Sequence, residues 1–270
     1  MSDLLLIDVG GTNMRYAYCE SGANEIHKSE KISLKNLDNF DTIIGDLIDN
    51  SDLSITNAVF SIAGPKIGNT ISMTNRSFVA NADNLLKKFK LDQCYLLNDW
   101  ESIGYSLKGT PEDKIEYIKS GIQINSNSLV LGPGTGLGAA FTSTDSVIAT
   151  ELGNTTNWTS SLLKNFAINN DNGHYKTLED IVSGSGISKL YKSLSGESIS
   201  AEEVIKRFNQ NEDLASNIIN GFIKSLANVL SDAALAYVPG NGIFLAGGLS
   251  RTLLPLICLL YTSPSPRDRG

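Results

Sequence analysis

The sequence predicts an α/β protein built from two similar αβ domains that face one another around a cleft. Two observations predict this fold class. Strand-like and helix-like segments alternate along the 270 residues, and the chain opens twice in the same way, with a strand, a Gly-Thr turn and a second strand. The two openings, LLLIDVGGTNMRYAY and SLVLGPGTGLGAAFT, stay in register when Gly11 is aligned with Gly134.

The elements of the first domain follow from hydrophobic periodicity and turn residues. Apolar runs predict strands at residues 4–9, 14–19, 26–33, 58–63 and 95–97, and Gly64-Pro65 ends the fourth of them. Apolar residues at helical spacing predict a helix over 37–49. We expect two further helices, at 81–90 and 100–107.

The second domain begins with strands and then becomes mostly helical. We expect strands at residues 128–131, 137–142 and 147–151, and a last strand at 242–246. Helical periodicity predicts helices at 160–167, 178–182, 187–194, 201–209 and 214–237. The predicted domains are residues 1–108 and 109–257, followed by a non-native tail at 258–270. The tail, CLLYTSPSPRDRG, breaks sharply in composition and resembles a translated sequencing adapter, so we expect the native C-terminus to be missing.

Composition argues against several classes of partner. The net charge of −7 and the pI near 4.9 make nucleic acid and anionic membranes poor partners. The apolar run at residues 4–9 is too short to span a membrane. Three cysteines without a CxxC motif indicate neither a zinc site nor a disulfide framework, and they favour a cytoplasmic protein.

Two glycine-rich turns are candidates for phosphate binding. Glycines let the backbone approach a ligand closely, and the N–H groups of a turn can hold phosphate oxygens. Asp8 at the end of the first strand can hold Mg²⁺ through water. A plain hairpin turn is an equally good interpretation of the first turn alone. The residues concerned are Asp8, Gly10, Gly11, Thr12 and Asn13 in the first turn and Gly134, Thr135 and Gly136 in the second.

Several polar residues are candidates for substrate contacts. Asp99 follows an apolar strand, where it can accept the proton of a substrate hydroxyl or, alternatively, cap the next helix. Glu151, Asn154 and Glu179 can each bind sugar hydroxyls, although each alone is more readily a solvated surface residue. Gly247-Gly248, between a strand and a helix, can lie against adenosine or form a simple turn.

The order of these motifs resembles the bacterial glucokinase family of the hexokinase superfamily, whose members have the actin-like, ribonuclease H-like ATPase fold. The motifs are LIDVGGTN, MTN at 73–75, NDW at 98–100, GPGTGLG, EDIVSGSG and AGGLS. The resemblance implies ATP-dependent phosphorylation of a hexose, most simply glucose to glucose 6-phosphate at the head of glycolysis, with Mg²⁺ as cofactor. A sugar-binding regulator without catalysis is the alternative, and a homodimer is an open option.

The resemblance also implies a role for each matching residue. Asp99 would be the general base. Asn75, Asn98, Glu151 and Glu179 would bind the sugar, and Gly247 and Gly248 the adenosine. Asn154 stands where the family usually has a sugar-binding histidine, which bears on sugar preference.

Overall fold

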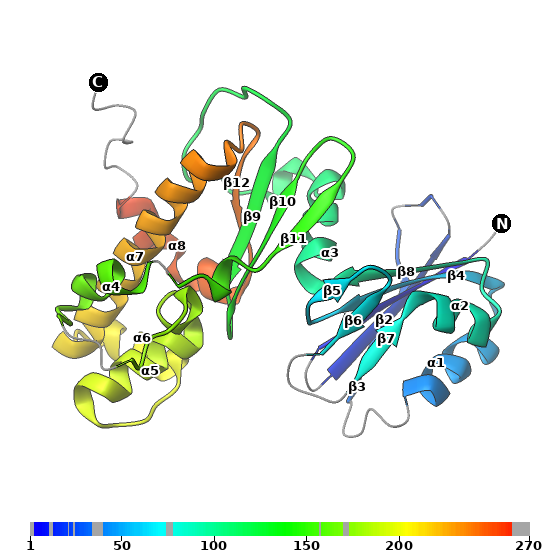
Figure 1. Cartoon of the computed structure of the whole chain (residues 1–270), viewed down its shortest axis with the longest axis horizontal. Coiled ribbons are helices and arrows are strands. Elements are labelled where there is room, and N and C mark those ends of the chain that lie inside the picture. The colour runs from blue at the N-terminus through cyan, green and yellow to red at the C-terminus, as the bar shows by residue number, and fades with distance from the viewer. Residues whose placement is uncertain are drawn as a thin grey trace. The chain divides into compact units, whose positions relative to one another are not determined.

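The protein divides into two compact units, Met1–Gly109 and Thr110–Gly270 (Figure 1). The computed structural model describes residues 3–10, 13–20, 22–23, 25–33, 40–73, 78–156, 158–169 and 173–260. Gly11, Thr12 and Asn75 lie outside these residues, as do residues 261–270 of the expected tail.

A five-stranded mixed sheet forms the centre of unit 1. Its order is β3-β2-β1-β4-β8, with β1, β2 and β3 antiparallel and β1, β4 and β8 parallel. In β1, Leu5, Ile7 and Val9 are buried, which is the alternation expected of a strand with one face on a core. The strands are β1 (Asp3–Val9), β2 (Asn13–Glu20), β3 (His27–Ser33), β4 (Ile55–Ile62) and β8 (Gln93–Asn98).

In the described residues of unit 1, three helices and a second, small sheet accompany the main sheet. Phe40 and Ile44 of α1 and Leu85 of α2 join the buried cluster formed by the main sheet. The helices are α1 (Phe40–Asp49), α2 (Ala82–Phe89) and α3 (Asp99–Ser106), the last followed by the 3-10 turn η2 (Leu107–Gly109). The small antiparallel sheet consists of β5 (Lys66–Ile67), β6 (Thr70–Ser72) and β7 (Val79–Asn81), which the sequence analysis did not anticipate.

The sheet of unit 2 repeats the connectivity of the sheet of unit 1. Its order is β11-β10-β9-β12, with an antiparallel meander followed by a strand parallel to the first. The strands are β9 (Ser128–Pro133), β10 (Leu137–Thr142), β11 (Val147–Thr150) and β12 (Gly242–Leu245). Every residue of β9 is buried, whereas all four of β12 are half-buried, and within the described residues β12 pairs on one side only.

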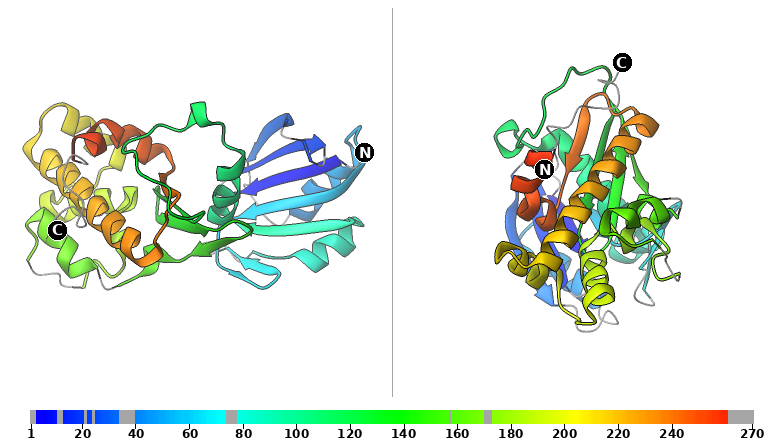
Figure 2. Two further views of the ribbon diagram at one scale, coloured as in Figure 1. Left: turned by 90° about the horizontal axis from the view of Figure 1, so that it is seen from above. Right: turned by 90° about the vertical axis from the view of Figure 1, so that its left-hand side faces the viewer.

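The helices of unit 2 lie beside this sheet (Figure 2). The long helix α7 packs against α5 and α6, and its buried residues Ile218, Phe222 and Leu226 join one large core. The helices are α4 (Thr159–Leu162), α5 (Gly184–Ser195), α6 (Ala201–Asn209), α7 (Asp213–Tyr237) and α8 (Gly248–Leu260). The 3-10 turns are η3 (Glu112–Lys114), η4 (Leu152–Asn154), η5 (Leu163–Phe166) and η6 (Leu178–Asp180). Among the residues described, no helix is long and apolar enough to cross a lipid bilayer.

Two expected helices are shorter than predicted. The helix expected at 160–167 is the four-residue α4 followed by η5, and the one expected at 178–182 is only η6. The second cannot continue because Ser183 is extended (φ −155°, ψ 171°) and caps α5 by accepting the Gly186 N–H. At the other end, α8 continues through Leu260 and includes the first residues of the expected tail.

Candidate functional site

Asp8, Asn98 and Asp99 lie where the three parallel strands of unit 1 end. Val9 of β1 is in register with Ile62 of β4, and Ile62 with Asn98 of β8. Gly10, Ala63 and Asp99, which follow these strand ends, therefore lie at one edge of the sheet. In α/β sheets the edge beyond the carboxyl ends of the strands is where ligands bind.

Asp8 presents a half-exposed carboxylate at this edge. Its Oδ2 lies 3.3 Å from Arg15 Nη1, directly across the β1–β2 ladder, and the two side chains are 49% and 64% exposed. An ion pair this exposed is weak and can be displaced by a ligand. Next along the chain, the Gly10 N–H donates to the Asn13 carbonyl oxygen at 2.9 Å, which closes the turn.

The carboxylate of Asp8 fits a magnesium ion held together with a nucleotide. Such an ion takes one or two protein carboxylates, often through water, and completes its coordination with phosphate oxygens. In the described ranges, no three His, Cys, Asp or Glu side chains form a metal-ligating group.

Asn98 and Asp99 divide the roles at the start of α3. Asn98 is the N-cap: its Oδ1 accepts the N–H groups of Trp100 at 2.9 Å and of Glu101 at 3.4 Å. The alternative that Asp99 caps the helix is therefore wrong. Asp99 is the first helical residue, and its Oδ1 accepts the Trp100 N–H at 3.0 Å.

The side chain of Asn98 also has structural partners on its nitrogen. Nδ2 donates to the Gly64 carbonyl oxygen at 2.8 Å, and the residue is only 7% exposed. An amide nitrogen carries two hydrogens, and the bond to Gly64 uses one of them. Asn98 thus joins the turn after β4 to the helix that carries Asp99.

The second glycine turn, which is in unit 2, lies beside Gly247 and Gly248. The parallel strands β9 and β12 are in register, Leu131 with Leu245, and the Ala246 N–H donates to the Leu131 carbonyl oxygen at 2.9 Å. Gly247 has φ +100°, a conformation that L side chains rarely adopt, and Gly248 begins α8. The expected phosphate turn and adenosine motif therefore share one edge of this sheet.

The start of α5 holds the second glycine turn in place. The Gly184 N–H donates to the Gly134 carbonyl oxygen at 2.7 Å, and the Ser185 hydroxyl donates to the Thr135 carbonyl oxygen at 2.7 Å. Thr135 itself is exposed, so its hydroxyl can meet a ligand. The SGSG sequence at 183–186 thus braces the turn; its small residues were the only sequence signal of this contact.

Glu179 lies against the same turn. Its Oε2 accepts the Leu137 N–H at 3.3 Å, and a Cβ added at Gly136 would stand 2.6 Å from that oxygen. The neighbouring Asp180 anchors η6: burial raises the pKa of its carboxyl, but hydrogen bonds from Lys189 and the Thr177 N–H lower it, leaving the pKa below its usual value.

Glu151 precedes η4 and Asn154 is its last residue, and η4 lies close to η6. Asn154 Nδ2 donates to Glu151 Oε2 at 2.8 Å, and both residues are exposed. The Leu178 N–H donates to the Thr155 carbonyl oxygen at 2.8 Å, which ties η4 to η6 and to Glu179. Unit 2 therefore gathers the three expected sugar contacts of its half of the chain near the second glycine turn.

Sequence reasoning missed two charged residues beside Asn98. Glu101 Oε2 accepts the Asn98 N–H at 3.1 Å, and the Lys66 ammonium of β5 contacts both carboxylate oxygens of Glu101. The Asn-x-x-Glu spacing from Asn98 to Glu101 is a capping-box signal that was available in the sequence. Lys66 carried no such signal, because its partner is 35 residues away.

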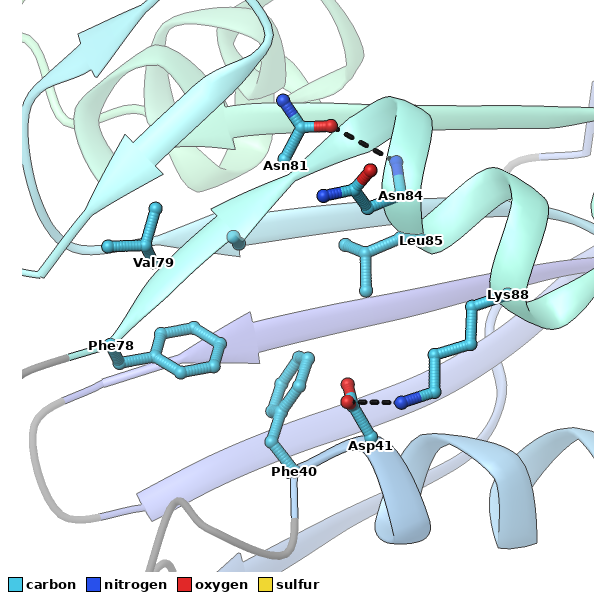
Figure 3. A pocket seen from close by; sticks show the side chains of 9 residues that line it. Phe40, Asp41, Phe78, Val79, Asn81, Asn84, Leu85 and Lys88 are labelled. Carbon is cyan, nitrogen blue, oxygen red and sulfur yellow. Dashed lines mark hydrogen bonds and ion pairs between the residues drawn. The ribbon is translucent and has the colours of Figure 1, made fainter.

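A pocket elsewhere in unit 1 contains none of the predicted site residues. It encloses about 180 Å³ between α1, α2 and β7, with the rings of Phe40 and Phe78 edge to face at 4.8 Å and an Asp41–Lys88 ion pair at its border (Figure 3). It is separate from the Asp8 and Asp99 edge.

Comparison with known proteins places the chain in a family. The glucokinase family profile matches residues 5–259. The glucokinase of Agrobacterium fabrum is 26% identical over 289 residues, which cover 94% of this chain and 79% of that one.

Solved structures show the actin-like ATPase fold that the motifs predicted. A glucokinase from an Antarctic psychrotroph matches with a TM-score of 0.78 at 23% identity and covers 99% of this chain and 88% of its own. A ROK family glucokinase from Streptomyces griseus, solved with glucose and AMPPNP, matches with a TM-score of 0.67 at 14% identity, covering 97% and 88%.

Proposed function

Because the chain belongs to the glucokinase family, we propose that it transfers the γ-phosphoryl group of ATP to the 6-hydroxyl of glucose. The observation that carries this proposal is the position of Asp99. It begins α3 directly beyond the carboxyl end of a parallel strand, and Asn98 rather than Asp99 serves as the helix cap. The Asp99 carboxylate thus stands at the carboxyl end of β8 and is not the N-cap of α3.

In the proposed reaction, Asp99 orients the 6-hydroxyl and takes its proton. The hydroxyl oxygen attacks the γ-phosphorus, the bond from that phosphorus to the β–γ bridging oxygen breaks, and ADP leaves with the negative charge. Phosphoryl transfer depends mostly on positioning and charge stabilisation, so an ordinary carboxylate suffices as base. Asn75, Asn98, Glu151, Asn154 and Glu179 are the proposed sugar contacts.

The glycine turns are proposed to hold the nucleotide. Gly10, Gly11, Thr12 and Asn13 and, in the second turn, Gly134, Thr135 and Gly136 would receive phosphate oxygens, and Gly247 and Gly248 would lie against the adenosine. Bound Mg²⁺ supplies charge neutralisation at the phosphates, and Asp8 would hold it through water. The Streptomyces griseus protein was solved with both glucose and AMPPNP, which supports this pair of ligands.

The cellular setting follows from the same proposal. We propose that the enzyme is cytoplasmic. The free cysteines Cys19, Cys94 and Cys258 are compatible with a reducing compartment. A homodimer is a further proposal, to be measured by sedimentation.

A coupled assay of ADP release tests the function. We expect turnover with Mg-ATP and glucose, and no turnover with 6-deoxyglucose, which lacks the acceptor oxygen but should compete with glucose. Mannose, fructose and N-acetylated hexoses measure how Asn154 affects preference. Absence of turnover with every sugar, in protein shown to be folded, would contradict the kinase and favour the sugar-binding regulator.

A further inference from the structure

The turn that follows β4 is fixed by its own backbone. Gly64 has φ +150°, and a Cβ added there would stand 2.1 Å from the Ser72 carbonyl oxygen, so only glycine lets this turn lie against β6. The Ser72 N–H donates to the Pro65 carbonyl oxygen at 3.3 Å. The backbone position of Lys66, the residue after Pro65, is therefore fixed.

Lys66 points its ammonium at a buried carboxylate. Nζ lies 3.1 Å from Glu101 Oε1 and 3.0 Å from Oε2, and the two side chains are 28% and 10% exposed. A buried ion pair of this kind adds little net stability, because the cost of desolvating both charges offsets much of their attraction. A role in fixing geometry is the better account, since the pair joins two elements that meet beside Asp99.

Glu101 links Lys66 to the residues at the start of α3. The oxygen that Lys66 contacts most closely, Oε2, also accepts the Asn98 N–H at 3.1 Å, while Asn98 Nδ2 returns to the Gly64 carbonyl oxygen at 2.8 Å. Gly64, Lys66, Glu101 and Asn98 thus form a closed ring of contacts. Asp99 is the residue that follows Asn98, so the ring sets the direction of its backbone.

We propose that Lys66 is a positioning residue for Asp99 and acts through Glu101 and Asn98 without touching substrate. The proposal rests on the proposed function, in which Asp99 is the base. Both carboxylate oxygens of Glu101 already accept hydrogen bonds from the Lys66 ammonium, so the Lys66 side chain is directed toward α3. Loss of the ammonium leaves a buried carboxylate without its cation, and Glu101 then turns toward water and releases the Asn98 N–H.

The first test is Lys66→Met, which keeps the apolar stem and removes the charge. We expect kcat with glucose to fall about ten- to a hundredfold, as for a small misplacement of a reacting group, with KM for ATP unchanged. The matched control is Lys88→Met, which removes the exposed ion pair with Asp41 in the same unit and should leave kcat unchanged. A Lys66→Met enzyme with wild-type kcat would overturn the proposal.

A double variant separates positioning from direct contact. In Lys66→Met/Glu101→Gln the amide oxygen at 101 can still accept the Asn98 N–H and needs no cation, so most of the lost rate should return. A double variant as slow as Lys66→Met, with KM for ATP raised in both, would mean that Lys66 contacts the nucleotide, and would also overturn the proposal. If Lys66→Met does not fold, the double variant and Lys66→Arg are compared with wild type instead.

Amide hydrogen exchange keeps the proposal distinct from the function on which it rests. The Asn98 and Glu101 N–H groups should lose protection in Lys66→Met and regain it in the double variant. If wild type turns over no sugar, the kinase proposal fails but this exchange pattern still supports the ring of contacts. Unchanged protection of both amides in Lys66→Met would refute the ring whatever the activity.

Discussion

The side-chain amide of Asn98 donates to the carbonyl oxygen of Gly64 at 2.8 Å, joining the ends of two neighbouring parallel strands. The same side chain caps α3, and its neighbour in the chain is Asp99. One residue therefore sets both the start of the helix and its distance from the turn after β4. Its substitution should affect activity more than its contribution as a cap alone would explain.

We predict that Asn98→Ala and Asn81→Ala cost similar stability but differ in activity. Asn81 caps α2 by accepting the Asn84 N–H at 3.0 Å and donates to Thr70 Oγ1 at 2.9 Å. Each change therefore removes one cap, worth about 1 kcal/mol in the free energy of unfolding, and one hydrogen bond donated by Nδ2. Only Asn98→Ala also frees the Gly64 carbonyl and the segment before Asp99. Urea unfolding and the ADP-release assay check this, and equal kcat in the two variants would contradict it.

Asp99→Asn should keep the fold and lose turnover. The amide oxygen can still accept the Trp100 N–H, so thermal unfolding should change little. Without a proton acceptor, kcat should fall by about 10²- to 10⁴-fold, the usual contribution of a positioned base. Glucose binding, measured by calorimetry, should persist. Near-normal turnover in this variant would remove Asp99 from the mechanism.

Gly153→Ala should destabilise unit 2. A Cβ at this position would stand 2.2 Å from the Leu137 carbonyl oxygen, a backbone atom that cannot rotate away. Overpacking of this kind costs about 1–3 kcal/mol, and it would press on η4 and on β10 behind the second glycine turn. The control is Gly121→Ala, where a Cβ meets nothing within 4 Å. A Gly153→Ala midpoint in urea equal to that of the control would be the contrary result.

Stability should fall at alkaline pH through Tyr16. Burial, together with a 2.7 Å hydrogen bond to Glu30, raises the pKa of Tyr16 to about 12, against about 10 in an unfolded chain. A pKa raised by folding contributes stability that is complete below about pH 10 and is lost as the pH rises toward about 12.

The test of this window is Tyr16→Phe, in which the alkaline loss of stability should be smaller than in wild type. Unfolding by urea at about pH 9 and about pH 11 brackets the window. Burial also raises the pKa of Tyr18, so some decline remains in the variant. Tyr105→Phe, at an exposed tyrosine, is the control; the same decline in all three proteins would argue against a role for Tyr16.

The alternating pattern of the sequence was enough to predict the two central sheets. The hairpins that surround the glycine turns appear as β1–β2 and β9–β10, since long apolar runs separated by glycines leave few alternatives. The sheet β5–β6–β7 was missed because its strands have only two or three residues each. Segments this short carry no period that a sequence can display.

The candidate site was predicted in part, and the division has a physical cause. Asp99 and Glu179 follow motifs, so their positions could be anticipated. That Asn98 is the cap depends on backbone angles at the strand–helix junction, which neighbouring Asn and Asp residues do not reveal. The contact of Lys66 with Glu101 and that of Ser185 with Thr135 join residues far apart in sequence, which one sequence cannot pair.

The half-buried strand β12 has a consequence for handling the protein. Its N–H and C=O groups on the side away from β9 have no strand partner in the part of the chain that the structure describes, and Ile243 and Phe244 are only half-buried. An open edge with apolar side chains is a template for another strand, including one from a second molecule. We expect concentrated preparations to self-associate at this edge, so a lysine at Phe244 should raise solubility.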